Sequence, residues 1–458
     1  MPTSSGSSGN PMTRVLIVSV GGSPEPILKA VELHQPDEVI FACSAPPCEE
    51  PSLNQVIGAG TPCLHRVDGQ EIARPNLVTQ LQLKGFREDL QVIRLPDPDD
   101  LNDCLNRVRA FVQALHSRFS QLELIGDFTG GTKSMSAALA FTLLEQQATL
   151  SVVSGKRDNL VRIERSEGLR IVDPLPFRAR RLLQERLPPL LETHLYGRAR
   201  TLLIEFLQEQ DEFLRPEQRQ ALDTLTGELQ VLVLWDRFRW REALDLAEQH
   251  QFHTTWPELW SWWLRVEASI DWDPMHEPQV AITGYELVQD LLLNAERRGR
   301  RGWYDDAVAR LYRALELLAQ TYVRLELGID GTPDWTGRTQ PPRLRSGEAI
   351  PTQRVVALYR WLQDREAPNG LGGLYGRQWR ELVSLFDARN KSLLGHGLRP
   401  IEPSEWQSLQ DRVSNLLSET LSALGIQQGE APCQLPGLEI LQHPLLPLLL
   451  SDAAPSQS

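Results

Sequence analysis

Short apolar runs alternate with amphipathic segments over the first 175 residues of the 458-residue chain. The runs "RVLIVSV" (14–20), "DEVIFAC" (37–43) and "LELIGDF" (122–128) have the continuous hydrophobicity of strands buried on both faces of a parallel sheet. The segments between such runs, for example 100–119, have helical periodicity. This alternation predicts a doubly wound α/β domain. Residues 159–173 are expected to end it as a hairpin that turns at "RSEG".

Two glycine-rich loops follow strands of this predicted sheet, "SVGGSPEP" (19–26) and "GDFTGGTKS" (126–134). In open α/β sheets, ligands bind at the carboxyl ends of strands, near the point where the strand order reverses. The glycines allow close approach of backbone N–H groups, Thr132 can cap a helix, and Lys133 supplies a point charge. Thr132 occupies the lysine position of a Walker loop, so the pattern differs from a nucleoside triphosphate site. For either loop alone, the favoured interpretation is a tight strand-to-helix turn, but the two loops together suit a phosphodiester.

Helical periodicity replaces the strand pattern beyond about residue 175, and residues 176–284 are expected to form an all-α connector. Seven of the twelve tryptophans lie between Trp235 and Trp272. Stacking of RNA bases on these rings is one interpretation. A hydrophobic core or dimer surface is the other, and it is favoured because leucines recur at matching helical spacing.

The net charge of −13 disfavours a protein that coats nucleic acid non-specifically, because such affinity needs clustered Lys and Arg. One basic cluster, "AERRGRRGW" (295–303), is either a solvated turn or an RNA contact. Five cysteines without C-x-x-C spacing indicate a reducing compartment and no zinc site. Residues 1–12 lack signal-peptide features and are expected to form a flexible tail. The proline-interrupted run 435–450 is too short to span a bilayer, so a cytoplasmic protein without a membrane partner is expected.

The region from about residue 285 contains the candidate chemistry. "YGRQWRELVSLFDARNKSLLGHGLRP" (375–400) predicts a helix on which Arg389 and His396, seven residues apart, face the same side. Histidine exchanges protons near neutral pH, and arginine stabilises the phosphorane formed when a 2′-hydroxyl attacks its own phosphodiester. No carboxylate cluster of the two-metal kind is evident, so no metal is expected. Taken alone, the pattern is weak, and it is better explained by His396 capping a helix beside Gly395 and Gly397.

Both halves of the chain resemble known families. The loops "LIVSVGGSPEPI" and "GDFTGGTKSMSAAL" resemble the signature loops of the CARF domain, the CRISPR-associated Rossmann fold, over residues 13–175. "RNKSLLGH" (389–396) resembles the R-x(4–6)-H motif of HEPN ribonucleases, over residues 285–428. This order resembles the CARF–HEPN ancillary ribonucleases of type III CRISPR systems. The expected fold class is therefore an α/β Rossmann-like N-terminal domain, an all-α connector and an all-α HEPN domain, with residues 429–458 as a C-terminal tail.

The resemblance implies a homodimer in which a cyclic tetra- or hexa-adenylate binds between two CARF domains. This ring acts as an allosteric activator, with no other cofactor, of metal-independent cleavage of single-stranded RNA to a 2′,3′-cyclic phosphate. The implied catalytic residues are Arg389, Asn390 and His396. The implied ring-binding residues are Ser19, Gly21, Gly22, Ser23, Thr129, Gly130, Gly131, Thr132 and Lys133.

Two alternatives remain open at this point. In the first, the protein is a messenger-binding regulator or scaffold whose HEPN domain is inactive. In the second, the CARF domain is a ring nuclease that degrades its own messenger, with Ser23, Thr132 or Lys133 as positioning groups.

Overall fold

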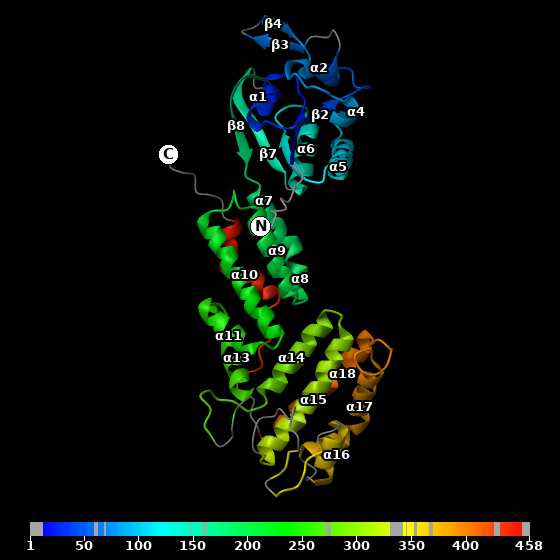
Figure 1. The fold of residues 1–458 in the computed structure, drawn as a ribbon, viewed down its shortest axis with the longest axis vertical. Coiled ribbons are helices and arrows are strands. Elements are labelled where there is room, and N and C mark those ends of the chain that lie inside the picture. Colours follow the sequence, from blue (N-terminus) through cyan, green and yellow to red (C-terminus); the bar gives the residue numbers. More distant parts are fainter. Residues whose placement is uncertain are drawn as a thin grey trace, which may run out of the picture. The chain divides into compact units, whose positions relative to one another are not determined.

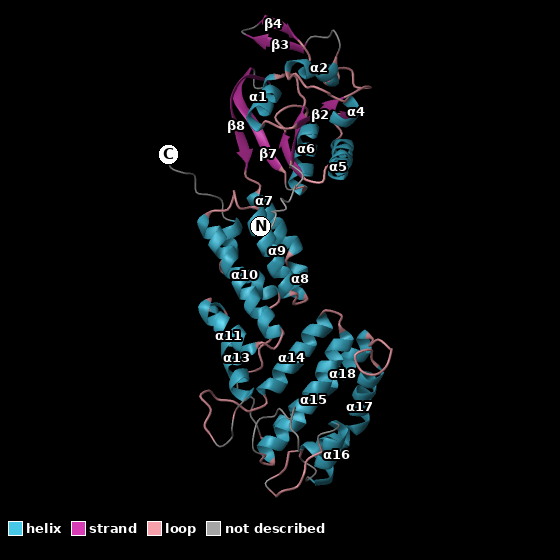
Figure 2. Ribbon diagram, viewed as in Figure 1, coloured by secondary structure: helices cyan, strands magenta, loops and turns pink. Residues whose placement is uncertain are grey.

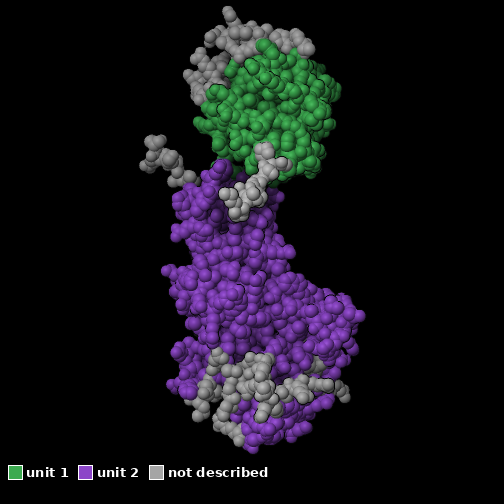
Figure 3. Space-filling model, in the orientation of Figure 1, with its two compact units in different colours: residues 1–174 green, residues 175–458 purple. Residues whose placement is uncertain are grey.

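The structure is a computed structural model that describes residues 12–58, 63–67, 70–146, 148–158, 162–270, 272, 276–329, 342–344, 346–351, 355–365, 370–425 and 431–450. The chain divides into two compact units, Met1–Pro174 and Leu175–Ser458 (Figure 3). The first is an α/β domain and the second is built of helices (Figure 1, Figure 2). Among the described residues, no helix is both long and apolar enough to cross a membrane.

The first unit contains a six-stranded sheet in the order β5-β2-β1-β6-β7-β8. Neighbouring strands are parallel, except that β8 runs antiparallel to β7. A separate antiparallel pair is formed by β3 and β4. The elements are β1 Thr13–Ser19, α1 Glu25–His34, β2 Glu38–Ser44, α2 Leu53–Ile57, β3 Cys63–Val67, β4 Gln70–Arg74, α3 Leu77–Gln80, α4 Glu88–Gln91, β5 Val92–Leu95, α5 Leu101–Arg118, β6 Leu122–Asp127, α6 Lys133–Glu145, β7 Thr149–Asp158 and β8 Arg162–Val172.

Helices cover both faces of the six-stranded sheet. On β1, Val15 and Ile17 belong to the core formed with α5 and α6, whereas Leu16 and Val18 belong to the core formed with α1. Successive strand residues point to opposite faces, which is why these strands read as continuous apolar runs. The predicted doubly wound α/β fold is confirmed. Because β1 lies between β2 and β6, the strand order reverses there, and the loops after β1 and β6 meet at one edge.

The hairpin predicted within residues 159–173 is wrong. The antiparallel partner of β8 is β7, which extends to Asp158, and the "RSEG" residues lie inside β8. Register shifts between Ser154 and Gly155 and between Lys156 and Arg157 let the long β7 continue the pairing beyond the end of its parallel contact with β6.

The second unit contains two hydrophobic cores. One is formed by residues 175–266 together with residues 435–449, and the other by residues 285–421. The elements are α7 Leu175–Arg181, the π-helix η1 Leu182–Arg186, α8 Pro188–Glu192, α9 Tyr196–Glu209, α10 Pro216–Asp236, α11 Trp240–Gln249, α12 Phe252–Thr255, α13 Pro257–Ile270, α14 Glu286–Arg300, α15 Tyr304–Glu326, α16 Val355–Arg365, α17 Leu371–Lys391, α18 Pro403–Ala423, the 3₁₀ helix η2 Leu438–Gln442 and α19 Leu446–Leu450.

Three tryptophans of the connector lie in its core. Trp235, Trp262 and Trp263 are fully buried, and the rings of Trp235 and Trp263 stack with centroids 4.2 Å apart. Rings buried in this way are closed to nucleic acid bases. For these three residues the core interpretation is confirmed.

The chain beyond α18 differs from the predicted C-terminal tail. Leu435, Ile440, Leu446 and Leu449 are buried in the connector core. Prolines divide this segment into the short helices η2 and α19. Helix η2 packs against α8, and α19 packs against α7 and α10. The last described residues are therefore part of the connector.

Candidate functional site

The helix that holds Arg389 ends before His396. Helix α17 stops at Lys391, and Ser392 is extended, with φ −73° and ψ 159°. The predicted continuous helix through His396 is therefore wrong, and the residue at the C-cap position of α17 is Ser392 instead of His396. The helix cannot continue because the backbone after Ser392 turns back and packs against the end of α17.

Backbone hydrogen bonds hold this loop next to the helix terminus. The N–H of His396 donates to the carbonyl of Asn390 at 3.1 Å, and the N–H of Arg399 donates to the carbonyl of Lys391 at 3.1 Å. A Cβ added at Gly395 would overlap the carbonyl oxygen of Arg389, so the close approach requires glycine there. The three predicted residues Arg389, Asn390 and His396 are thus brought together, by a loop instead of a helix face.

Asp305 ties the same loop to α15, and the sequence analysis missed it. Its Oδ1 accepts from the N–H of Leu393 at 3.3 Å, and its Oδ2 accepts from the N–H of Ile401 at 3.2 Å. One carboxylate therefore holds both ends of the His396 loop. An acidic residue in the first turn of a helix is ordinarily interpreted as a favourable partner of the helix dipole, so the sequence carried no sharper signal.

Arg389 is positioned by an aromatic ring and an amide. Its guanidinium carbon lies 5.0 Å from the centroid of the Tyr312 ring, and its Nη1 donates to Oδ1 of Asn390 at 3.3 Å. Burial raises the pKa of Tyr312, so its hydroxyl stays neutral. No ion pair to a carboxylate is formed by Arg389 within the described part of the chain. Arg389 is half-buried, whereas Asn390 and His396 are exposed, which leaves the arginine charge available to an anion.

The two glycine-rich loops of the first unit touch each other. The Ser19 hydroxyl donates to the carbonyl of Gly130 at 2.6 Å. A Cβ at Gly21 would lie 2.7 Å from the nitrogen of Gly131, and a Cβ at Gly130 would lie 2.6 Å from the carbonyl oxygen of Ser19. Gly131 has φ +82°, which favours glycine. The predicted proximity of these loops is therefore a feature of the fold, and their glycines are needed for it.

Asp127 holds the second loop in place and was missed by the sequence analysis. Its Oδ1 accepts from the N–H of Thr129 at 3.1 Å and its Oδ2 accepts from the hydroxyl of Ser151 at 3.1 Å. His34 contacts Ser151 in turn, with Nε2 2.9 Å from Oγ. Burial raises the pKa of Asp127, and hydrogen bonds from Thr129 and Ser151 oppose that rise. The sequence contained this signal, because Asp127 lies within the loop segment 126–134.

The hydroxyls of Thr129 and Thr132 are engaged in local structure. Thr129 Oγ1 accepts from the N–H of Val153 at 2.7 Å. Thr132 caps α6 by accepting from the N–H of Met135 at 3.2 Å, and its hydroxyl bonds to the carbonyl of Pro98. By contrast, Gly22, Gly131 and Lys133 are exposed, and Ser23 is half-exposed.

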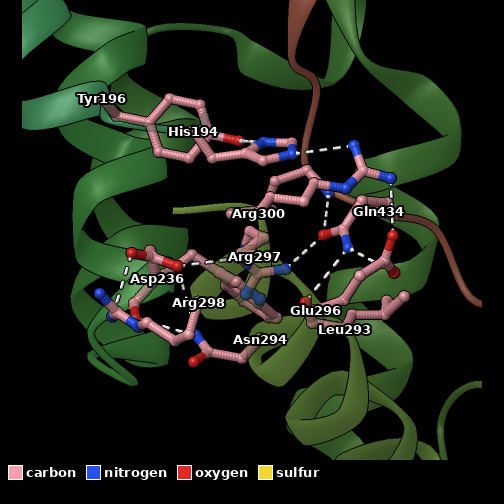
Figure 4. Close-up of polar contacts among 12 residues, drawn as sticks. His194, Tyr196, Asp236, Leu293, Asn294, Glu296, Arg297, Arg298, Arg300 and Gln434 are labelled. Atoms are coloured by element: carbon pink, nitrogen blue, oxygen red, sulfur yellow. Dashed lines mark hydrogen bonds and ion pairs between the residues drawn. The ribbon is translucent and has the colours of Figure 1, made fainter. Parts of the chain in front are cut away.

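Three arginines of the basic cluster at residues 297–301 do not form the solvated turn of the first interpretation. Arg297 and Arg298 form ion pairs with the buried carboxylate of Asp236, with N–O distances of 2.9 and 3.2 Å (Figure 4). Arg301 forms a third, at 2.9 Å. Burial alone raises the pKa of Asp236, but the three guanidinium groups outweigh it and lower the pKa. Asp236 and these arginines therefore form a buried ion-pair network between α10 and α14. The sequence does not predict it, because a run of arginines is ordinarily interpreted as an exposed surface.

The described residues contain no group of three or more His, Cys, Asp or Glu side chains arranged to hold a metal ion. Residues 281–420 match a family model described as the Csm6 HEPN domain. The solved structure of Enterococcus italicus Csm6 bound to cyclic hexa-2′-fluoro-hexa-dAMP is similar in fold, with a TM-score of 0.55 and 13% sequence identity; the match covers 96% of this chain and 99% of that chain. No curated protein sequence matches the chain. The resemblance of the chain to CARF–HEPN ancillary ribonucleases, which the sequence motifs indicate, is therefore confirmed by the family-model match and the fold.

Proposed function

We propose that the protein is a cytoplasmic endoribonuclease that cleaves single-stranded RNA without a metal and is activated by a cyclic oligoadenylate. Arg389, Asn390 and His396 are its catalytic residues in this proposal. The observation that carries it is the loop after α17, whose backbone bond from His396 to Asn390 holds the histidine beside the arginine. The Csm6 HEPN family-model match over residues 281–420 supports the same chemistry.

The reaction is an attack of a ribose 2′-oxygen on the adjacent phosphorus. A neutral imidazole of His396 accepts the 2′-hydroxyl proton as the O2′–P bond forms, and a protonated imidazole donates to the 5′-oxygen as the P–O5′ bond breaks. Arg389 neutralises the charge that develops on the phosphorane oxygens. Tyr312 and Asn390 hold its guanidinium in place beforehand, which reduces the cost of ordering it. The products are a 2′,3′-cyclic phosphate and a 5′-hydroxyl.

The reaction needs one neutral and one protonated imidazole, and two chains supply them. Leu393, Leu394 and Leu398 lie in the His396 loop and are 64%, 57% and 88% exposed. Clustered exposed leucines favour a protein interface. In a two-fold homodimer the same loop of both chains meets at the axis, so the two catalytic sets form one composite site.

The first unit supplies the activator site in this proposal. The touching loops present Gly21, Gly22 and Gly131 backbone groups, and Lys133 adds an exposed cation at the N-terminus of α6. Ser19, Thr129 and Thr132 hold the loops in shape, and Ser23 lies beside them. The similar Enterococcus italicus protein was solved with a cyclic nucleotide of six units. A cyclic tetra- or hexa-adenylate is the corresponding ligand here.

The test is cleavage of a fluorescent single-stranded RNA in EDTA with saturating cyclic oligoadenylate. Arg389→Ala and His396→Ala are compared with wild type and with His253→Ala, an exposed histidine on α12 that serves as the control. The expected result is a loss of about a hundredfold or more in each catalytic variant, an unchanged control, and products that end in a cyclic phosphate. Equal activity in all four proteins, or activity that EDTA abolishes, contradicts the proposal.

A further inference from the structure

A polar cavity of about 580 Å³ lies in the second unit, where α9 and α10 meet the turn between α14 and α15. Arg198, Arg237, Arg298 and Arg301 line it, and Asp236 is the one carboxylate in its lining. The Asp236 charge is already matched by ion pairs within the network at its base. The cavity wall therefore carries excess positive charge, in a chain whose net charge is −13. Such a concave surface attracts a polyanion.

Two of these arginines are available for a ligand. The side chains of Arg198 and Arg237 are exposed and form no hydrogen bond or ion pair among the described residues. They lie on different helices, Arg198 on α9 and Arg237 at the end of α10, and converge on one cavity. Two such guanidinium groups that line one cavity from different helices suit two phosphates of one strand.

The cavity also presents an aromatic ring. Trp303 lines it with 47% of its surface exposed, and the guanidinium carbons of Arg298 and Arg301 each lie 5.4 Å from its ring centroid. Burial lowers the pKa of Arg298 to about 10, so it stays protonated at neutral pH. An exposed ring beside cationic groups is the combination with which proteins stack a base of single-stranded nucleic acid.

This cavity and the His396 loop lie at the same end of α15. Trp303 is the residue before α15, and Asp305, two residues later, holds both ends of the His396 loop. Asp306 follows and pairs with Arg298 at 3.5 Å. In Figure 1, the turn between α14 and α15 and the loop that follows α17 lie close together at one end of these helices. A strand bound at the loop therefore has a short path to the cavity.

We infer that this cavity is a second binding site for single-stranded RNA, which takes phosphates on Arg198 and Arg237 and stacks a base on Trp303. The inference rests on the proposed function, because the strand bound here is the one that the His396 loop cuts. The site positions the substrate and takes no part in the chemistry. Its loss raises KM and leaves kcat nearly unchanged.

The test is RNA binding by the full chain, measured by fluorescence anisotropy of a labelled single-stranded RNA over a series of salt concentrations. His396→Ala is the parent protein, so that bound RNA is not cut. Arg198→Gln with Arg237→Gln is compared with a control that removes two other exposed, unpaired arginines of the second unit, Arg180→Gln with Arg186→Gln. Thermal unfolding of each variant verifies that it is folded.

We expect the Arg198 and Arg237 double variant to bind more weakly and to reduce the slope of log affinity against log salt by about 1.4, because each phosphate contact on a single strand contributes about 0.7. Trp303→Ala is expected to weaken binding roughly tenfold with the slope unchanged. Binding and slope equal to those of the control pair overturn the inference, as does a parent protein that binds no RNA. Failure of the proposed function is detected in a different experiment, because the wild-type protein would then not cleave RNA, whatever the RNA-binding measurement shows.

Discussion

Substitution of Asp305 is expected to release the His396 loop without disturbing the core. The Asp305 carboxylate accepts from two backbone N–H groups, those of Leu393 and Ile401, at 3.3 and 3.2 Å. These are long hydrogen bonds at a partly exposed site, so each contributes about 1 kcal/mol, the value for an ordinary hydrogen bond and less than that for a short bond to a charged acceptor. Asp305→Ala therefore costs about 2 kcal/mol of loop order, equal to roughly thirtyfold in the population of the closed loop.

Hydrogen–deuterium exchange of peptides from residues 392–401 measures this directly in the whole protein. We expect exchange to accelerate roughly thirtyfold in Asp305→Ala and about fivefold in Asp305→Asn, which keeps one acceptor oxygen. Asp411→Ala on α18 is the control, because among the described residues its carboxylate accepts from Gln407 on its own helix and from no other group. RNA cleavage is expected to fall in the same order. Unchanged exchange in this loop, or lost cleavage with normal exchange, refutes the positioning role of Asp305.

Three further predictions concern other sites. Burial lowers the pKa of His194 from 6.5 to about 4. Between these pH values the unfolded chain therefore binds more protons than the folded chain, so the free energy of unfolding falls as the pH drops from 6.5 towards 4. About 2 kcal/mol of this free energy is lost between pH 7 and pH 5. Chemical denaturation should show this loss in wild type and not in His194→Asn, which tolerates the φ of 53°. Asp236→Asn leaves buried arginines without their counter-charge and is expected to lower the unfolding free energy by about 3–5 kcal/mol in the same assay, whereas a loss under 1 kcal/mol contradicts the ion-pair network. Gly21→Ala places a Cβ 2.7 Å from the nitrogen of Gly131, so calorimetry should show at least tenfold weaker binding of the cyclic oligoadenylate, and wild-type affinity contradicts the loop assignment.

The α/β half of the fold could be predicted because its information is local. Strands such as Thr13–Ser19 are buried on both faces, so each reads as an uninterrupted apolar run between helical segments. The meeting of the two glycine loops followed from the same order, since β1 and β6 are neighbours at the point where the strand order reverses.

The end of α17 could not be predicted in the same way. Apolar residues continue beyond Lys391 as Leu393 and Leu394, which extends the helical pattern, yet these side chains are exposed. The loop depends on a carboxylate 88 residues earlier in the chain and on glycine at position 395, where any side chain would overlap the helix end. Such tertiary contacts leave no periodic signal in the sequence.

Charge and apolar patterns in the sequence wrongly placed two segments on the surface, because each segment is buried by a partner that lies far away in the chain. The arginines at 297–301 look like a solvated patch, but three of them form ion pairs with the buried carboxylate of Asp236, about 60 residues earlier. The leucines after residue 434 resemble a tail, but they complete the connector core. In both cases the partner lies far away in sequence, so composition alone assigns the segment to the surface.

The central claim is that a ring bound to the first unit switches on RNA cleavage by the Arg389–His396 site. The most direct measurement is a titration of cyclic tetra-adenylate, and separately of cyclic hexa-adenylate, into the wild-type protein in EDTA while the initial rate of RNA cleavage is recorded. We predict that one of the two rings raises the rate at least about tenfold, with saturation at one ring per two chains. A cleavage rate that is the same with and without either ring contradicts the account.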